Sequence, residues 1–118
     1  MGLLSRLFHS KSSAGKAPSL QEVAIHFAYG STNFQHLYSV QDKLEHAVLE
    51  AKVGEFDGHE LADDGSDGTL YFSGPDAEVI FATIRPILEA TPFMRGAAVT
   101  LRFGPKGFGT PKRVVELS

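Results

Sequence analysis

Hydrophobic and polar residues alternate along residues 22–29, which is the pattern of a β-strand with one buried face. The same alternation predicts a strand over residues 99–103, and residues 113–117 predict a last strand. Two weaker segments, residues 55–61 and 69–73, are joined by a loop rich in Asp and Gly. Such a loop between two short extended segments predicts a β-hairpin.

An amphipathic helix is predicted after the first strand. Ser39 and Asp42, three positions apart, form a capping box that favours a helix beginning at Ser39. We expect the helix to last to about Lys52, because Gly54 follows. Its apolar positions form one stripe: Val40, Leu44, Ala47, Val48 and Ala51.

A second amphipathic helix is predicted after the hairpin. Ser73 and Asp76 repeat the cap spacing, with Pro75 in the first turn, and the helix extends to about Ala90. Pro86 removes a backbone donor inside this segment, so we expect it to bend or break the helix. The expected apolar face consists of Ala77, Ile80, Phe81, Ile84 and Leu88.

The order of these elements is strand, helix, strand, strand, helix, strand, with an extra strand at the C-terminal end. This order is typical of the α+β class and, within it, of the ferredoxin-like βαββαβ sandwich. In such a fold two helices cover one face of an antiparallel sheet, and the first and third strands lie inside the sheet. The opposite face of the sheet is expected to stay open.

The chain is long enough for one domain and not for two. It has 118 residues, of which 42% are hydrophobic, and this content supports one core without disulfides. We assign residues 19–118 to a single ferredoxin-like domain and residues 1–18 to a flexible basic N-terminal tail and linker. The chain has no cysteine, which excludes thiol chemistry and fits a cytoplasmic protein.

The first eight residues are amphipathic, with Leu3, Leu4, Leu7 and Phe8 on one side of a short helix. Arg6 interrupts the apolar run, so a secretory signal is not expected. This peptide allows a weak contact with a membrane surface or a partner, but a frayed end without a function is the favoured interpretation. No apolar stretch is long enough for a transmembrane segment.

The net charge differs between the tail and the rest of the chain. The whole chain has a formal net charge of −3, and residues 1–16 contain three basic and no acidic side chains. The remaining residues 17–118 therefore carry −6, which argues against a broad basic surface for nucleic acid. Lys106, Phe108 and Lys112 allow at most a small patch for a single strand, so no nucleic-acid partner is expected.

The open sheet face is the first candidate site, because a sheet presents side chains from several strands on one rigid surface. We expect His26 to lie near Thr69 or Tyr71, with Arg102 and Thr100 on one side and Glu55 or Asp57 on the other. An imidazole, a phenol, a guanidinium and a carboxylate can together bind an anionic ligand or move a proton. The same residues also fit the polar side of ordinary strands or a dimer interface, which the aromatic Tyr71 favours.

The acidic hairpin is the second candidate. Asp63, Asp64 and Asp67 follow three other acids, and no Lys or Arg occurs among residues 55–67. A calcium site of the EF-hand type is not expected, because glycines occupy two of its ligand positions. A solvated hairpin tip is one interpretation, and a docking patch for a basic partner is the other.

No catalytic motif or cofactor site is visible in the sequence. The five histidines lack the spacing of metal ligands, and no serine lies in a nucleophile elbow. The glycine-rich segment 104–111 lacks the Gly-Lys-Ser/Thr triplet of a phosphate-binding loop. We therefore expect no catalytic residue, no metal and no cofactor.

Turn and cap motifs occur in three segments, which are GEFDG at residues 54–58, LYFSGPDAEVIF at residues 70–81 and RGAAVTLRFGP at residues 95–105. These segments resemble small bacterial proteins that share the ferredoxin-like α+β pattern and have no established activity. The resemblance spans about half of the chain, and its motifs are turn glycines, a helix cap and alternating strands. It implies a bacterial cytoplasmic protein and carries over no catalytic residue.

The function predicted from these patterns is an interaction. We expect a non-enzymatic module that forms a homodimer or binds another protein through its open sheet face or an edge strand, residues 114–117 being the candidate edge. The alternative is a small-molecule-binding protein or an enzyme with a polar site built from His26, Tyr71, Arg102 and Asp57.

Overall fold

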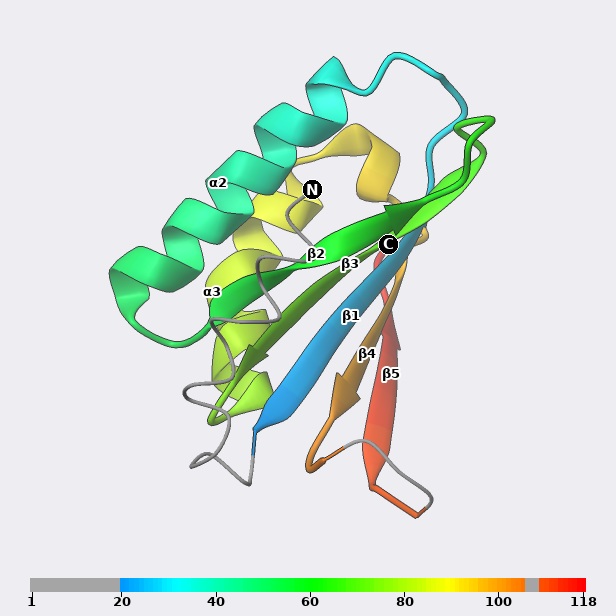
Figure 1. Cartoon of the computed structure of the whole chain (residues 1–118). Coiled ribbons are helices and arrows are strands. Elements are labelled where there is room, and N and C mark those ends of the chain that lie inside the picture. Colours follow the sequence, from blue (N-terminus) through cyan, green and yellow to red (C-terminus); the bar gives the residue numbers. More distant parts are fainter. Residues whose placement is uncertain (1–19, 106–108) are drawn as a thin grey trace.

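A five-stranded antiparallel sheet carries two helices on one of its faces in the computed structural model (Figure 1). The structure describes residues 20–105 and 109–118, so the predicted tail and the residues Lys106 and Phe108 lie outside the described residues. In chain order the elements are β1 (Gln21–Ala28), α2 (Gln35–Ala51), β2 (Glu55–Leu61), β3 (Asp67–Gly74), α3 (Ala77–Glu89), the 3₁₀ helix η1 (Pro92–Met94), β4 (Ala98–Arg102) and β5 (Lys112–Glu116).

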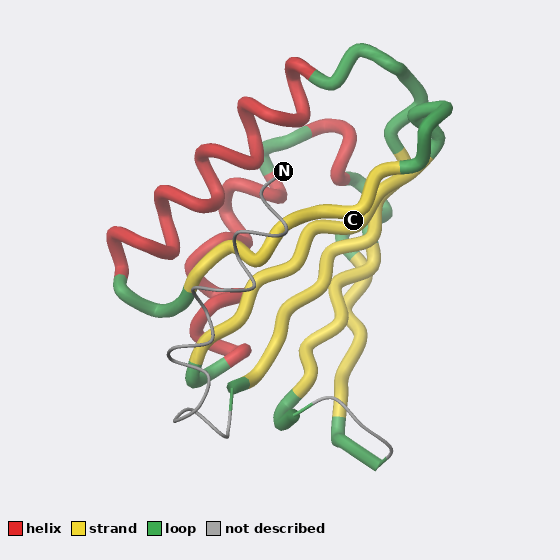
Figure 2. The backbone as a smooth tube through the Cα atoms, viewed as in Figure 1, coloured by secondary structure: helices red, strands yellow, loops and turns green. Residues whose placement is uncertain are grey.

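The strands are arranged in the order β2-β3-β1-β4-β5, and every neighbouring pair is antiparallel. The predicted α+β class is therefore confirmed, and so is the position of the first and third strands inside the sheet. The extra C-terminal strand β5 forms one edge and β2 forms the other. Figure 2 shows both helices gathered on the same side of the sheet.

The hydrophobic core lies between the sheet and the two helices. Alternate residues of the strands point into it, as the sequence pattern predicts, and they are Val23, Ile25, Phe27, Leu70, Phe72, Val99 and Leu101. The helices contribute their apolar stripes, which are Leu37, Val40, Leu44 and Val48 from α2 and Ala77, Ile80, Phe81, Ile84 and Leu88 from α3. Burial of these side chains holds the helices on one face and leaves the other face uncovered by them.

The start predicted for the first helix is wrong, because α2 begins at Gln35 and Ser39 lies inside it. The apolar stripe extends one turn further toward the N-terminus than the capping box indicates, since Leu37 is completely buried. Phe34 occupies the cap position and stacks on Tyr29 with 5.8 Å between ring centroids. Tertiary packing therefore sets the first turn, in place of the local cap.

The second helix begins at Ala77 with Asp76 as its N-cap, so the cap predicted at Ser73 is also displaced. The Asp76 carboxylate accepts a hydrogen bond of 3.0 Å from the backbone N–H of Glu78. The predicted break at Pro86 does not occur, because α3 continues to Glu89. Pro86 lies on the exposed side of the helix, where water can satisfy the carbonyl that lacks its usual donor.

Within residues 20–105 and 109–118, neither α2 nor α3 has the length and apolar character needed to span a membrane.

Candidate functional site

The side chains that point away from the helices form a surface that we call the open face. They alternate with the buried positions of each strand and include Glu22, Ala24, His26, Glu55, Glu60, Thr69, Tyr71, Ser73, Thr100, Arg102, Lys112, Val114 and Glu116. The strand register arranges them in rows that run across the sheet. These rows, and not the strands, decide which of the candidate residues meet.

One row crosses the middle of the open face and contains no charged side chain. Tyr71 lies opposite Ala24, Ala24 lies opposite Thr100, and Thr100 lies opposite Val114. We call these four residues the central stripe. Except for Val114, whose side chain is exposed, they are half-buried by their neighbours on the sheet.

Charged residues line the central stripe on one side. Glu22 lies opposite Arg102, and their carboxylate and guanidinium are 3.6 Å apart. The next strand places Lys112 opposite Arg102, so two cations lie side by side at the β5 end of this row. Glu55 of β2 lies at the other end of the same row, opposite Ser73.

His26 lies on the other side of the central stripe and joins a hydroxyl to a carboxylate. Its Nδ1 is 3.1 Å from Oγ1 of Thr69, and its Nε2 is 3.2 Å from a carboxylate oxygen of Asp67. The predicted proximity of His26 and Thr69 is confirmed. A hydroxyl, an imidazole and a carboxylate in this sequence can relay a proton. The His26 side chain is 56% exposed, however, so water competes at every step.

Tyr71 donates a hydrogen bond of 2.7 Å from its hydroxyl to the carboxylate of Glu60. This hydrogen bond raises the pKa of Tyr71 above its ordinary value, and partial burial and the negative charges of Glu60 and Glu22 raise it further. The phenol is therefore held neutral and oriented along the sheet.

Asp57, a predicted site residue, does not share the strand register of the other predicted site residues. The pairing of β2 with β3 steps from Phe56 directly to Gly58, so Asp57 is the extra residue of a β-bulge. Glu60, which sequence reasoning did not select, takes the place opposite Thr69. The signal available in the sequence was Gly58, whose φ of +118° suits the distorted backbone.

Three of the four residues predicted as one site, His26, Tyr71 and Arg102, thus share the open face without forming a cluster. His26 lies opposite Ala98, whereas Arg102 lies opposite Glu22. Four residues of a strand span about 13 Å, which is too far for both side chains to hold one small ligand atom. Thr69 and Asp67 replace Arg102 and Asp57 as the neighbours of His26.

The acidic hairpin is more than a solvated tip, because its turn packs on the loop after β1. Gly65 is buried, and its carbonyl accepts hydrogen bonds from the N–H groups of Gly30 and Ser31 at 2.6 and 3.2 Å. Hydrogen bonds from the side chain and from the backbone N–H of Ser66 to the Asp64 carboxylate lower the pKa of Asp64. The side chains of the acidic hairpin remain at the surface, with Asp63 and Asp64 exposed and Asp67 half-buried.

An aromatic cluster that sequence reasoning missed lies where α2 begins. The Phe93 ring of η1 meets Tyr29 at 5.0 Å and His36 at 5.2 Å between centroids. Beside it, His59 stacks on Tyr38 and places its Nδ1 2.8 Å from Oε1 of Gln41. Burial lowers the pKa of His59. These residues come from separate segments of the chain, so no local sequence pattern predicts the cluster.

A cavity of about 80 Å³ lies between the end of α3, η1 and the chain end at Leu117 and Ser118. Its volume corresponds to a few water molecules. None of the candidate residues on the open face lines it. In residues 20–105 and 109–118, no three His, Asp or Glu side chains gather in a way that would hold a metal ion.

Comparisons with protein-family models, with curated proteins and with solved structures find no match to this chain.

Proposed function

We propose that this chain is a protein-binding module whose partner docks on the open face. The observation that carries the proposal is the central stripe, which runs uncharged across four strands between two rows of charged side chains. Protein interfaces have this anatomy, with a weakly polar centre, an aromatic residue and a charged rim. The sheet holds these side chains in place before binding, which reduces the ordering cost of association.

The acids at the β2 end of the open face and in the hairpin favour a partner with a basic surface. Glu55 and Glu60 lie on β2, and Asp63, Asp64 and Asp67 lie in or next to the hairpin turn. Charges at the rim of an interface mainly raise the rate of encounter and exclude partners of the same charge. We infer that these acids steer a basic protein toward the open face.

A small-molecule site is the second candidate, and the observation that favours it is the contact of His26 with Thr69 and Asp67. Small-molecule sites are usually concave. They exclude water, and this strengthens the electrostatic interactions between the site and its ligand. The three side chains lie on a sheet surface, with His26 and Asp67 56% and 46% exposed. The arrangement therefore supports the protein-binding proposal better.

The test compares two tyrosine variants of the full chain. Tyr71→Ser removes the aromatic residue of the central stripe, and Tyr38→Ser removes an exposed tyrosine from α2 as the matched control. Each tagged protein is used to purify partners from cells of its source, and the partners identified by mass spectrometry are then purified and titrated. We expect a partner that keeps its affinity for Tyr38→Ser and loses about tenfold or more for Tyr71→Ser.

The proposal is rejected if no purified partner distinguishes the two variants, provided that both have the circular dichroism spectrum of the wild type. A small molecule that remains bound to the wild type and is lost on His26→Ala would instead support the second candidate.

A further inference from the structure

The two edges of the sheet differ in how well they are protected from pairing. β2 carries a bulge at Asp57, which hinders pairing with another edge strand, and its charged side chains are acids without a Lys or Arg on the same strand, so two copies of β2 would repel one another. β5 pairs with β4 without a register shift and carries Val114. Val114 is 57% exposed, the largest exposed fraction of any large hydrophobic residue in the described chain. The β5 edge is therefore the one open to a further strand.

The backbone groups of β5 alternate between its inner and outer sides. The N–H of Leu117 donates to the carbonyl of Ala97, and the carbonyl of Pro111 accepts from the N–H of Phe103. Odd-numbered residues thus direct their backbone groups toward β4. By the period of two in a strand, Lys112, Val114 and Glu116 direct theirs outward, away from the sheet.

We propose that β5 pairs antiparallel with β5 of a second copy of this chain, in the register that places Val114 opposite Val114 of the second copy. In this register the outward backbone groups of the two strands meet. Lys112 lies opposite Glu116 of the second copy, and the same pair forms again across the twofold axis. Lys112, Val114 and Glu116 all point to the open face, so both charge pairs flank the contact of the two valines.

The charge pattern selects this register over its neighbours. A shift by one residue would place each residue with outward backbone groups opposite a residue whose groups are directed toward β4, so the outward groups would lose their partners. A shift by two residues would place Lys112 opposite Val114 or Ser118 and would leave no opposite charges in register. The sequence Lys-Arg-Val-Val-Glu is thus complementary to itself in one antiparallel arrangement.

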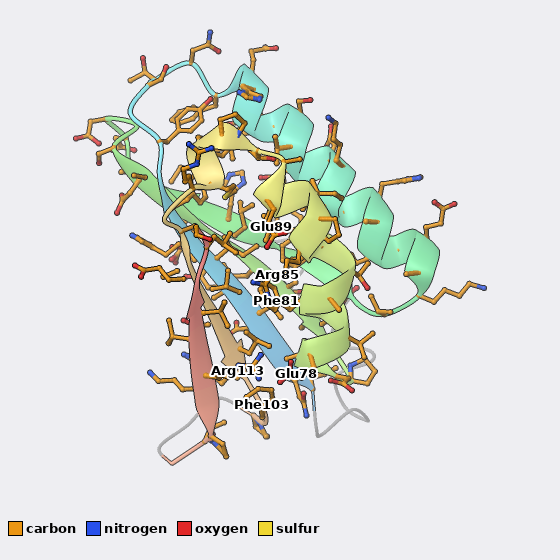
Figure 3. All side chains as sticks on the ribbon, turned by 180° about the vertical axis from the view of Figure 1, so that it is seen from behind. Glu78, Phe81, Arg85, Glu89, Phe103 and Arg113 are labelled. Atoms are coloured by element: carbon orange, nitrogen blue, oxygen red, sulfur yellow. The ribbon has the colours of Figure 1, made fainter. Side chains whose placement is uncertain are left out.

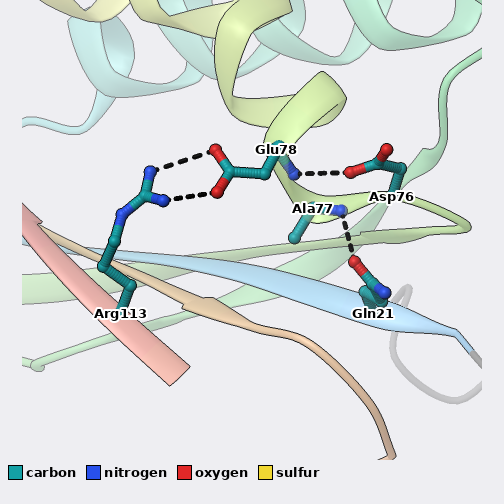
Figure 4. A network of polar contacts seen from close by, with 5 residues as sticks. All are labelled: Gln21, Asp76, Ala77, Glu78 and Arg113. Carbon is teal, nitrogen blue, oxygen red and sulfur yellow. Dashed lines mark hydrogen bonds and ion pairs between the residues drawn. The ribbon is translucent and has the colours of Figure 1, made fainter. Parts of the chain in front are cut away.

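Arg113, the other cation of β5, does not disturb the proposed charge pairs, because Glu78 holds it on the face that carries the helices. Arg113 donates from both terminal nitrogens to the two carboxylate oxygens of Glu78 at the start of α3, and Figure 4 shows this bidentate ion pair. Figure 3 shows the same two side chains directed toward one another. The guanidinium therefore stays with the helices, and Lys112 is the cation of β5 on the open face.

This inference deepens the proposed function and rests on it for its biological meaning. Pairing at β5 would join the two open faces into one continuous sheet surface carrying two central stripes, which doubles the area offered to a partner. A five-residue edge is small for an interface, so we expect association that depends on protein concentration and weakens as salt is added.

The experiment uses charge reversal at the two paired positions, measured by sedimentation equilibrium of the full chain. Lys112→Glu and Glu116→Lys each place like charges opposite one another twice per dimer, and we expect each to weaken the dimer about tenfold or more. An equimolar mixture of the two variants restores opposite charges at both pairs and should dimerise again, as should the double variant K112E/E116K. Lys43→Glu on α2 makes the same change of charge away from β5 and should dimerise like the wild type.

A wild-type chain that stays monomeric at every concentration overturns the inference. So does a dimer that Lys112→Glu and Lys43→Glu weaken equally, or a mixture of the single variants that fails to dimerise. The proposed function has a separate readout, since partner binding is tested with Tyr71→Ser and Tyr38→Ser. A failed dimer with intact Tyr71-dependent binding therefore rejects only the edge pairing, and the reverse outcome rejects only the protein-binding proposal.

Discussion

Tyr71 and Glu60 are joined across the β2–β3 pair by a hydrogen bond of 2.7 Å from the phenol hydroxyl to the carboxylate. The bond holds the aromatic side chain of the central stripe against an acidic side chain of the edge strand β2. Because it stabilises the neutral phenol and places a negative charge beside it, the pKa of Tyr71 is raised.

Glu60→Gln is expected to lower the pKa of Tyr71 toward its ordinary value of 10.0. The raised pKa means that the stabilisation is present below about pH 10 and is lost as pH rises through the folded value. Ultraviolet absorbance of tyrosinate measures the titration, and Tyr71→Phe identifies which part of it belongs to Tyr71. An unchanged titration curve in Glu60→Gln would show that the hydrogen bond is not the cause.

His59 is expected to make the protein less stable in weak acid. Its folded pKa lies below the unfolded value of 6.5, so stability is fully present above 6.5 and declines as pH falls toward the folded value. Urea unfolding at a series of pH values measures the free energy of unfolding. His59→Gln should make this free energy decline less as pH falls. His46→Gln, on the exposed surface of α2, serves as the control and should leave the decline in place.

Two substitutions test where the helices begin. Asp76→Ala removes the side chain that accepts from the N–H of Glu78 and should cost about 1 kcal/mol in the free energy of unfolding. Ser39→Ala changes an exposed residue inside α2, where alanine is the better helix former, and should cost nothing or add slightly to stability. A larger loss for Ser39→Ala than for Asp76→Ala, measured by thermal or urea unfolding, would restore the cap assignment that the sequence favours.

Gly65→Ala should destabilise the packing of the acidic hairpin on the loop after β1. A Cβ at Gly65 would lie 1.9 Å from the carbonyl oxygen of Ser31, and the backbone φ there is +74°. Gly96→Ala is the matched control, because its φ is +85° and no atom lies within 4 Å of the added Cβ. We expect about 1–2 kcal/mol of strain at Gly96 and a distinctly larger loss at Gly65. Equal losses in urea unfolding would mean that the hairpin does not pack on this loop.

Much of the fold follows from the sequence because strands and helices leave periodic patterns. Val23, Ile25 and Phe27 alternate with polar residues, and all three point into the core as predicted. The apolar face of α3 is also predicted without error, since Ala77, Ile80, Phe81, Ile84 and Leu88 are all buried. The first turn of α2 was missed because Leu37 and Phe34 pack on distant residues, which a local cap pattern does not report.

The candidate site was less predictable, because it depends on register. The sequence placed His26, Tyr71 and Arg102 on one face, and their strand positions bear this out. It did not reveal that a bulge displaces Asp57, since one inserted residue changes every later pairing of the strand. Glu60 was therefore overlooked as the partner of Tyr71.

The amino-acid sequence alone determined which segments are strands and helices and which of their faces are apolar, because side-chain direction repeats over two residues in a strand and over three to four in a helix. The tertiary structure alone decided which side chains meet. The contact of His26 with Asp67 and the outward direction of Val114 at the sheet edge follow from strand pairing, and the packing of Gly65 on Ser31 joins two loops that follow paired strands. Such pairing connects positions far apart in the chain, and no local pattern encodes it.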